Sequence, residues 1–268
     1  MPSFLLLAMA SIALTTEQHE DYACKGYLIV HGVLTEREVL AFLKHEAEPK
    51  PESMQKGLLS HTSDPMWDYI ARHPNIAGIA QQLLNGRTRI VQTMYLAKHP
   101  ADTNGDGGGR GIAIHQDTHY LPSEPNTLMA CWIAMNDTGP DNGGFCVLPG
   151  SHRGALRNTR KNDDDDHLSW EKEHLMRDRT GREWEQTMYS FQIEDLNDDE
   201  IERLTIPRCS AVFFSGMTVH GSFANHSTRP RLAFAVHYIH EDSWLLRADV
   251  QETALVSDFA AGLPESVK

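Results

Sequence analysis

The pattern of hydrophobic and polar positions divides the chain into a helical first third and a strand-rich remainder. Residues 15–24 are typical of a short helix, and residues 27–30 (YLIV) of a brief strand. Thr35 and Glu38 have the spacing of a capping box ahead of a periodic apolar face, which predicts the start of a second helix. Residues 74–84 repeat the helical pattern, so helices are expected to dominate this part of the chain.

From about residue 89 onward the apolar residues come in short runs separated by turn signals. The runs expected to form strands cover residues 90–97, 112–117, 128–135, 145–148, 211–214 and 231–239. Helices first and many short strands afterwards predict a mainly β fold, a sandwich or barrel with helical buttresses. We expect one domain over residues 14–268, preceded by an extension over residues 1–13.

Residues 151–206 interrupt this strand pattern with a long, polar and uneven segment. It contains helix-like patches such as HLSWEKEHLMRDR and the acidic run 163–166. A segment of this length inside a compact domain is usually functional, and we interpret it as a lid-like insert over the mouth of the barrel. The acidic run lacks the spaced carboxylates of a calcium loop and indicates a solvated loop.

Composition narrows the possible partners. The formal net charge of -13 leaves no basic excess to neutralise phosphates, which disfavours nucleic acid. The apolar run 4–14 is too short to span a bilayer and lacks a basic flank, so no membrane association is expected. The four cysteines are widely spaced, without a CxxC pair, which favours free thiols in the cytoplasm. Export, suggested by the apolar run, is the alternative, and the oligomeric state is left open.

The candidate chemistry begins at His115-Gln116-Asp117, on or just after an expected strand. Side chains alternate along a strand, so His115 and Asp117 are expected to point the same way. A second histidine from a distant strand would complete a 2-His-1-carboxylate face, which is diagnostic of non-haem Fe(II) oxygenases. His119 falls on the same expected face and is also a candidate ligand.

His220 is the preferred distal histidine because of its surroundings. It follows the turn at Ser215-Gly216, and an arginine opens the next strand beyond it. Arg229 and Arg231 both stand there, and the fork of an arginine suits the far carboxylate of a keto acid such as 2-oxoglutarate. His226 lies in the turn and His237 far along the neighbouring strand, so both are weaker candidates.

Several ordered motifs, TMYLAKHP, HQDTHYLP, CWIAMNDTGPDNGGFCVLPGSHRG and VFFSGMTVHGSFANHSTRPRLAFAVHYI, resemble the phytanoyl-CoA dioxygenase family of Fe(II)/2-oxoglutarate oxygenases. The resemblance runs from about residue 14 to residue 239, least in the insert. It implies a double-stranded β-helix (jelly-roll, cupin-like) core, with Fe(II), 2-oxoglutarate and O₂ as cofactor and cosubstrates. The residues implied as iron ligands are His115, Asp117 and His220. Those implied at the cosubstrate are Arg231, for which Arg229 is the reserve candidate, and Lys98, Trp132 and Ser222.

The resemblance therefore implies hydroxylation of a small organic substrate, with release of succinate and CO₂. Related halogenases carry a small residue in place of Asp117, so the aspartate favours oxygenation. The alternatives are another cupin-like metalloenzyme that does not use 2-oxoglutarate, or a non-catalytic binding protein on the same scaffold. The substrate is left open among acyl-CoA thioesters, amino-acid-like compounds, phosphonates and secondary metabolites. The basic residues that could serve CoA phosphates are Arg153, Arg157, Arg160 and Lys161.

Overall fold

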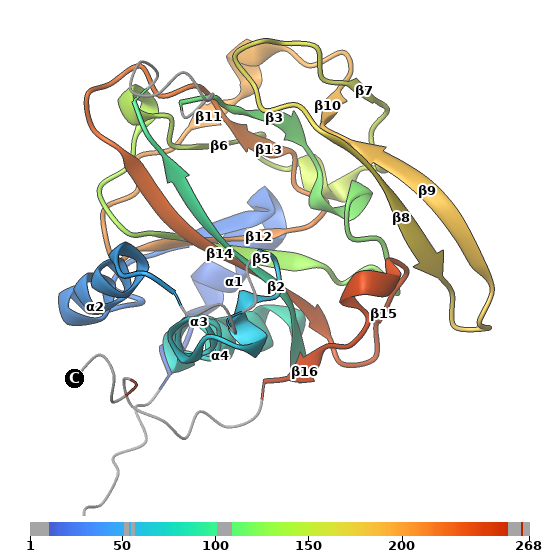
Figure 1. Ribbon diagram of the computed structural model, residues 1–268, viewed down its shortest axis with the longest axis horizontal. Helices are drawn as coiled ribbons and strands as arrows, with labels where there is room; N and C mark the ends of the chain where they lie inside the picture. Colours follow the sequence, from blue (N-terminus) through green and yellow to red (C-terminus); the bar gives the residue numbers. More distant parts are fainter. Residues whose placement is uncertain (1–10, 51–53, 55–56, 101–108, 257–263, 265–268) are drawn as a thin grey trace, which may run out of the picture.

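The computed structural model describes residues 11–50, 54, 57–100, 109–256 and 264, and its core consists of two antiparallel sheets (Figure 1). The larger sheet has the strand order β1 (Tyr27–Val30), β12 (Ala211–Ser215), β5 (Met129–Ala134), β14 (Arg231–His240), β2 (Thr88–Lys98) and β16 (Ala254–Leu255). The smaller sheet has the order β11 (Glu202–Arg203), β6 (Phe145–Val147), β13 (His220–Ser222) and β3 (Ile112–His115). Two facing antiparallel sheets with crossing connections form the expected jelly-roll, or double-stranded β-helix.

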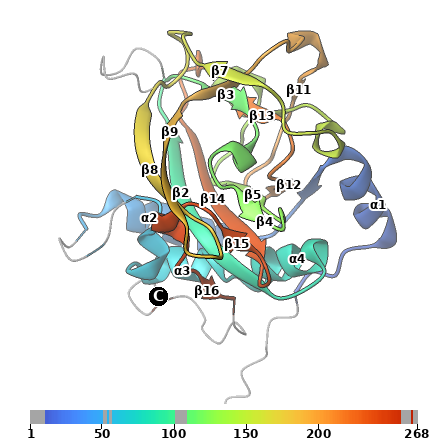
Figure 2. The same ribbon diagram turned by 90° about the vertical axis from the view of Figure 1, so that its right-hand side faces the viewer.

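The helices of the first third cover the outer face of the larger sheet (Figures 1 and 2). They are α1 (Thr16–Lys25), α2 (Glu36–Ala47), α3 (Pro65–Ala71) and α4 (Pro74–Leu84). Thr35 and Glu38 form the predicted capping box at the start of α2, and Asn85 ends α4 in the left-handed conformation. The pattern did not predict α3, a short helix that begins with Pro65 after the N-cap Asp64.

Alternation along the central strands divides the hydrophobic core into two layers. On β5, Cys131 and Ile133 pack toward the helices, whereas Ala130 and Trp132 face the smaller sheet. The strand β14 alternates in the same way, with Phe234 among the residues packed toward the helices. The inner layer is where the smaller sheet lies close to the larger one, and it opens into the cavity described below.

The insert departs from the helical patches expected within it. Residues 171–177 form β8 (Glu171–Arg177), which pairs with β9 (Glu183–Tyr189) in a long hairpin that projects from the sheets (Figure 1). Only His174 and Met176 of β8 are buried, two residues apart, which is the period of a strand with one covered face. The helix-like interpretation was wrong because polar and charged residues mask this period in the sequence.

Short pairs of strands complete the structure. These are β10 (Phe191–Ile193) with β7 (Thr159–Lys161), and β15 (Trp244–Leu245) with β4 (Ser123–Glu124).

Most of the extension expected over residues 1–13 lies outside the described residues. Among the described residues, no helix has the length and apolar character needed to span a membrane. Cys24, Cys131, Cys146 and Cys209 all carry free thiols, as expected.

Candidate metal centre

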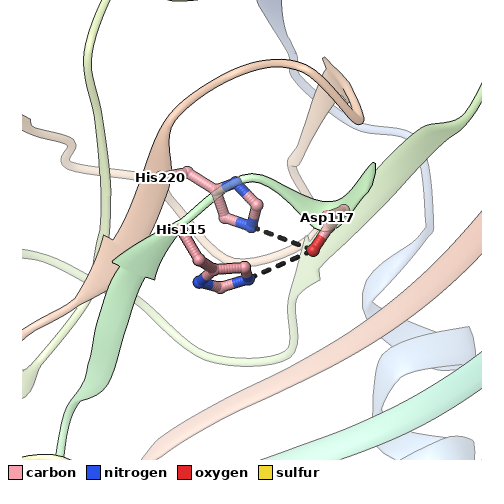
Figure 3. A group of neighbouring side chains, drawn as sticks. All are labelled: His115, Asp117 and His220. Atoms are coloured by element: carbon pink, nitrogen blue, oxygen red, sulfur yellow. Dashed lines mark hydrogen bonds and ion pairs between the residues drawn. The ribbon is translucent and has the colours of Figure 1, made fainter. Parts of the chain in front are cut away.

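His115, Asp117 and His220 converge in the cavity between the two sheets (Figure 3). His115 is the last residue of β3 and lies directly opposite His220 of β13 in the antiparallel register. Asp117 begins a 3-10 turn (Asp117–His119), so strand alternation is not what directs its carboxylate toward His115. The pairing was predicted correctly, but the physical reason given for Asp117 was wrong: the turn after the strand brings its side chain back.

The hydrogen bonds of the two imidazoles fix which nitrogen faces Asp117. Nδ1 of His115 donates to the carbonyl of Ala113 at 2.7 Å, and Nδ1 of His220 donates to that of Thr218 at 2.9 Å. In neutral imidazoles this leaves Nε2 without a proton. The two Nε2 atoms lie 3.1 and 3.6 Å from Oδ1 of Asp117, so three lone-pair atoms face one another. Such a donor set repels itself without a cation and fits a divalent metal with N and O ligands.

The protonation states agree with this geometry. Burial lowers the pKa of His220 to about 4, which keeps its imidazole neutral at pH 7. Burial alone raises the pKa of Asp117, but the nearby imidazoles of His220 and His237, together with the hydrogen bond from His237, outweigh it. The pKa of the Asp117 carboxyl is therefore held well below its ordinary value. A neutral imidazole and an ionised carboxylate are the forms that bind metals.

A third histidine contacts the carboxylate from its other side. Nε2 of His237, on β14, lies 3.0 Å from Oδ2 of Asp117. Nε2 of Gln92, on β2, lies 3.4 Å from Nδ1 of His237, so the amide donates to Nδ1 and Nε2 carries the proton given to Asp117. Sequence reasoning treated His237 only as a weaker ligand candidate and missed this contact. His237 lies two and four residues after Ala235 and Ala233, which face the inner layer, so all three share one face of β14. This spacing was the signal that could have revealed the contact with Asp117.

The other histidines considered as ligands lie elsewhere. Nε2 of His119 contacts the carbonyl of Arg157 at 3.1 Å, and His226 is exposed in the turn before β14. The described His, Asp, Glu and Cys side chains offer one further group within metal-binding distance, His45, Glu46 and Asp64. Its carboxylates already accept hydrogen bonds from Trp67 and from the start of α3, which is a structural role.

The four residues implied at the cosubstrate come together next to the triad. Arg231 is 2% exposed, lines the cavity, and lies with its Cζ 5.5 Å from the centre of the Trp132 ring. Nζ of Lys98 donates to Oγ of Ser222 at 2.8 Å. Trp132 and Ser222 line the cavity, whereas Lys98 lies behind Ser222. Burial and the charge of Arg231 lower the pKa of Lys98 to about 6.

The turn at Asn142 to Gly144 supports the side chains of Arg231 and Lys98. The carbonyl of Gly143 accepts from both Nε of Arg231 and Nζ of Lys98, each at 3.3 Å. Gly143 has a positive φ of 72°, and a Cβ there would lie 2.9 Å from Cδ of Lys98. The carbonyl of this glycine therefore orients both basic side chains. The reserve candidate Arg229 is 62% exposed and pairs with Asp141 outside the cavity.

The cavity has a volume of about 430 Å³, and the insert forms part of its wall. The insert contributes Leu168, Trp170, Lys172, His174 and Ser190, and the segment after β15 contributes Arg247 and Asp249. The basic residues considered for CoA phosphates do not line it. Arg160 bonds Asp163, and Lys161 pairs with Glu171. The sequence did not reveal the wall residues, because the hairpin β8–β9 had not been recognised.

Comparison with known proteins shows which sequences share these features. The sequence model of the phytanoyl-CoA dioxygenase family matches residues 55–233. A phytanoyl-CoA dioxygenase of Arabidopsis thaliana is 26% identical over 217 residues, which cover 78% of this chain and 68% of that protein. The phytanoyl-CoA dioxygenase domain-containing protein 1 of Danio rerio is 26% identical over 73% of this chain, which spans only 60% of that protein's length. A probable alpha-ketoglutarate-dependent hypophosphite dioxygenase of Stutzerimonas stutzeri is 24% identical over 86% of this chain and 80% of its own.

Solved structures share the fold at lower sequence identity. The epimerase SnoN, in complex with Fe3+, alpha ketoglutarate and nogalamycin RO, superposes with a TM-score of 0.63. It is 20% identical, and the match covers 86% of this chain and 85% of SnoN. EctD from S. alaskensis, with 2-oxoglutarate and 5-hydroxyectoine, gives a TM-score of 0.61 at 15% identity, over 89% of this chain and 82% of EctD.

Proposed function

Because this chain belongs to the phytanoyl-CoA dioxygenase family, we propose that it is an Fe(II)- and 2-oxoglutarate-dependent dioxygenase that hydroxylates a small organic substrate. The reaction consumes one substrate C–H bond, one 2-oxoglutarate and one O₂, and yields the alcohol, succinate and CO₂. The observation that carries the proposal is the meeting of Nε2 of His115, Nε2 of His220 and Oδ1 of Asp117 beside a buried arginine. Two histidines and one carboxylate are the ligand set of non-haem Fe(II) oxygenases.

Each side chain has a defined task in this function. Fe(II), when bound, would activate O₂, which is the oxidant, and 2-oxoglutarate would supply two of the four electrons that O₂ takes up. His115, Asp117 and His220 hold the metal, and the carbonyls of Ala113 and Thr218 keep both imidazoles in the tautomer that exposes Nε2.

Arg231 binds the far carboxylate of 2-oxoglutarate. Its Nε and Nη1 are held by the carbonyls of Gly143 and Leu96, so the guanidinium is already oriented when the cosubstrate enters. Ser222 contributes its hydroxyl, Lys98 donates a hydrogen bond that orients this hydroxyl, and Trp132 supplies an apolar wall. In a cupin-like metalloenzyme that does not use 2-oxoglutarate, the buried guanidinium of Arg231 would have no cosubstrate carboxylate to bind.

The direct test measures succinate formation and O₂ uptake in the presence of Fe(II) and 2-oxoglutarate. Both are expected to depend on the metal and to be lost in His115→Ala and Asp117→Ala. Full coupled turnover in either variant would contradict the assignment of these residues as metal ligands. Independently of turnover, 2-oxoglutarate is expected to raise the melting temperature only when metal is present, since a ligand that binds the folded state stabilises it. An equal rise in melting temperature without metal would favour a function in which 2-oxoglutarate binding does not depend on the metal.

The wider organisation is part of the proposal. Residues 14–268 act as one oxygenase domain, and residues 151–206 act as a lid whose hairpin borders the cavity. The four free thiols support a reducing, cytoplasmic compartment. The partner is a small molecule that the 430 Å³ cavity can enclose.

A further inference from the structure

The cavity has a second polar region, away from the proposed 2-oxoglutarate residues. Arg231 opens β14, whereas Arg247 follows the end of that strand and of β15. Both arginines line the same cavity, so its two ends each carry a guanidinium. Only the first of them is assigned to the cosubstrate.

Arg247 is 4% exposed and only partly satisfied. Its Nε donates to Oδ1 of Asp249 at 2.7 Å, and its Nη1 donates to the carbonyl of Tyr120 at 3.3 Å. Its Nη2 is buried and has no hydrogen-bond partner among the described residues. A buried guanidinium donor without an acceptor is costly, and an anion is the partner that its geometry fits.

The charges around Arg247 also favour an anionic ligand. The ionisable groups near it on this wall are Lys172, His174 and Asp249. Burial lowers the pKa of His174, with the charge of Arg247 adding to the effect, so this imidazole is neutral at pH 7. Two cations and one carboxylate leave this wall positive, in a chain whose net charge is -13. A local field of this kind attracts an anion that the rest of the surface repels.

The neighbouring surface is apolar and aromatic. Tyr120 and Trp170 both line the cavity, with their ring centres 5.6 Å apart. Trp170 belongs to the insert, so an organic group bound against these rings would also contact the proposed lid. This wall suits an apolar body attached to the anionic group.

We propose that Arg247 binds a carboxylate of the organic substrate, whose apolar body packs against Tyr120 and Trp170. The inference rests on the proposed function only in taking this cavity as the substrate site. It assigns the substrate to the class of organic acids and gives Arg247 a role separate from that of Arg231.

The test compares 4-phenylbutyrate with its neutral amide, 4-phenylbutyramide, as calorimetric probes. The protein is saturated with Mn(II) and 2-oxoglutarate under nitrogen, so that no turnover occurs. The acid is expected to bind at least about tenfold more tightly than the amide, which is the fold-change that corresponds to one charge-assisted hydrogen bond. Equal binding of the two probes, or binding of neither, would overturn the proposal.

Variants assign the preference to Arg247. Arg247→Met is expected to bind the acid and the amide equally. Arg247→Lys keeps the positive charge and is expected to retain part of the preference for the acid. The lysine variant also tests the proposal if Arg247→Met does not fold. Arg177→Met is the matched control, because Arg177 follows Met176, which forms a β-bridge with Arg247, but Arg177 itself pairs with Glu183 outside the cavity. A full preference for the acid in Arg247→Met would contradict the inference, as would a loss of 2-oxoglutarate binding in that variant.

The two proposals fail in different ways. If 2-oxoglutarate does not bind the metal-loaded wild type, the proposed function is contradicted whatever the probes do. If 2-oxoglutarate binds normally and acid and amide are not distinguished, only the role of Arg247 is contradicted.

Discussion

Nε2 of His237 lies 3.0 Å from Oδ2 of Asp117, while Oδ1 of the same carboxylate faces Nε2 of His115 and of His220. The carboxylate is thus held by one oxygen and leaves the other for the metal. Partners of this kind orient metal ligands, and their loss typically lowers metal affinity by about 10- to 100-fold. His237 is therefore a positioning residue and not a fourth ligand.

We expect His237→Leu to weaken Mn(II) binding by about that factor, because Asp117 can then rotate away from the two imidazoles. Calorimetric titration of the metal-free protein measures the effect without any turnover. His237→Gln, which keeps a donor, is expected to recover part of the affinity, and the exposed His226→Leu to leave it unchanged. Wild-type affinity in His237→Leu would show that the turn alone holds Asp117.

Arg231 and Arg229 are expected to differ sharply in 2-oxoglutarate binding. Arg231 lines the cavity at 2% exposure, whereas Arg229 is exposed and pairs with Asp141. Loss of charge-assisted hydrogen bonds costs about 1.5–3 kcal/mol, so Arg231→Ala should raise the dissociation constant of 2-oxoglutarate by about 10- to 100-fold. Arg229→Ala should change it little, and titration of the Mn(II)-loaded variants compares them. The reverse order would transfer the role to Arg229.

Gly143→Ala tests the turn that supports Arg231 and Lys98. A Cβ at this position would lie 2.8 Å from the carbonyl oxygen of Phe223 and 2.9 Å from Cδ of Lys98. Gly32→Ala is a matched control, since Gly32 also has a positive φ but nothing within 4 Å. Both variants carry a backbone cost of about 1–2 kcal/mol. Only Gly143→Ala should lose more stability in urea unfolding and bind 2-oxoglutarate more weakly. Equal losses in both variants would show that crowding against Lys98 has no effect.

Glu38 predicts how stability depends on pH at the helical face. Burial raises the pKa of Glu38, but hydrogen bonds from His73, Tyr69 and the start of its helix outweigh it and lower the pKa to about 2. A lowered pKa gives stability that is present above the unfolded-state value of about 4.5 and lost as the pH falls toward 2.

Wild-type protein should therefore lose about 2 kcal/mol of unfolding free energy through this group as the pH falls from 7 to 2.5. In Glu38→Gln this part of the pH dependence should be absent, as urea titrations across the range would measure. Glu36→Gln, at an exposed position of the same helix, is the control and should follow the wild type. Identical pH profiles for wild type and Glu38→Gln would contradict the role of the buried carboxylate.

Local signals were enough to predict much of the fold and the candidate metal ligands. The capping box at Thr35 and Glu38 and the short apolar runs depend on neighbours within one turn or one strand, so the sequence displays them directly. His115 and Asp117 are two residues apart, and His220 was found from the turn before it and the arginine after it. A β-sandwich or barrel with helical buttresses and the group of candidate ligands therefore followed from local signals, whereas the jelly-roll core was implied by the family resemblance.

The remaining features depend on contacts between distant residues. His237 meets Asp117 across 120 positions, and the register that places Gln92 beside it is set by the pairing of β2 with β14. The hairpin β8–β9 could not be distinguished from helix by its polar sequence, because only two of its first seven residues are buried and only tertiary packing decides which. The orphaned donor of Arg247 is likewise defined by what surrounds it. The sequence by itself determined the candidate metal ligands, and the tertiary structure decided what orients them and what the opposite wall of the cavity can bind, since burial and hydrogen-bond partners arise only when distant segments pack together.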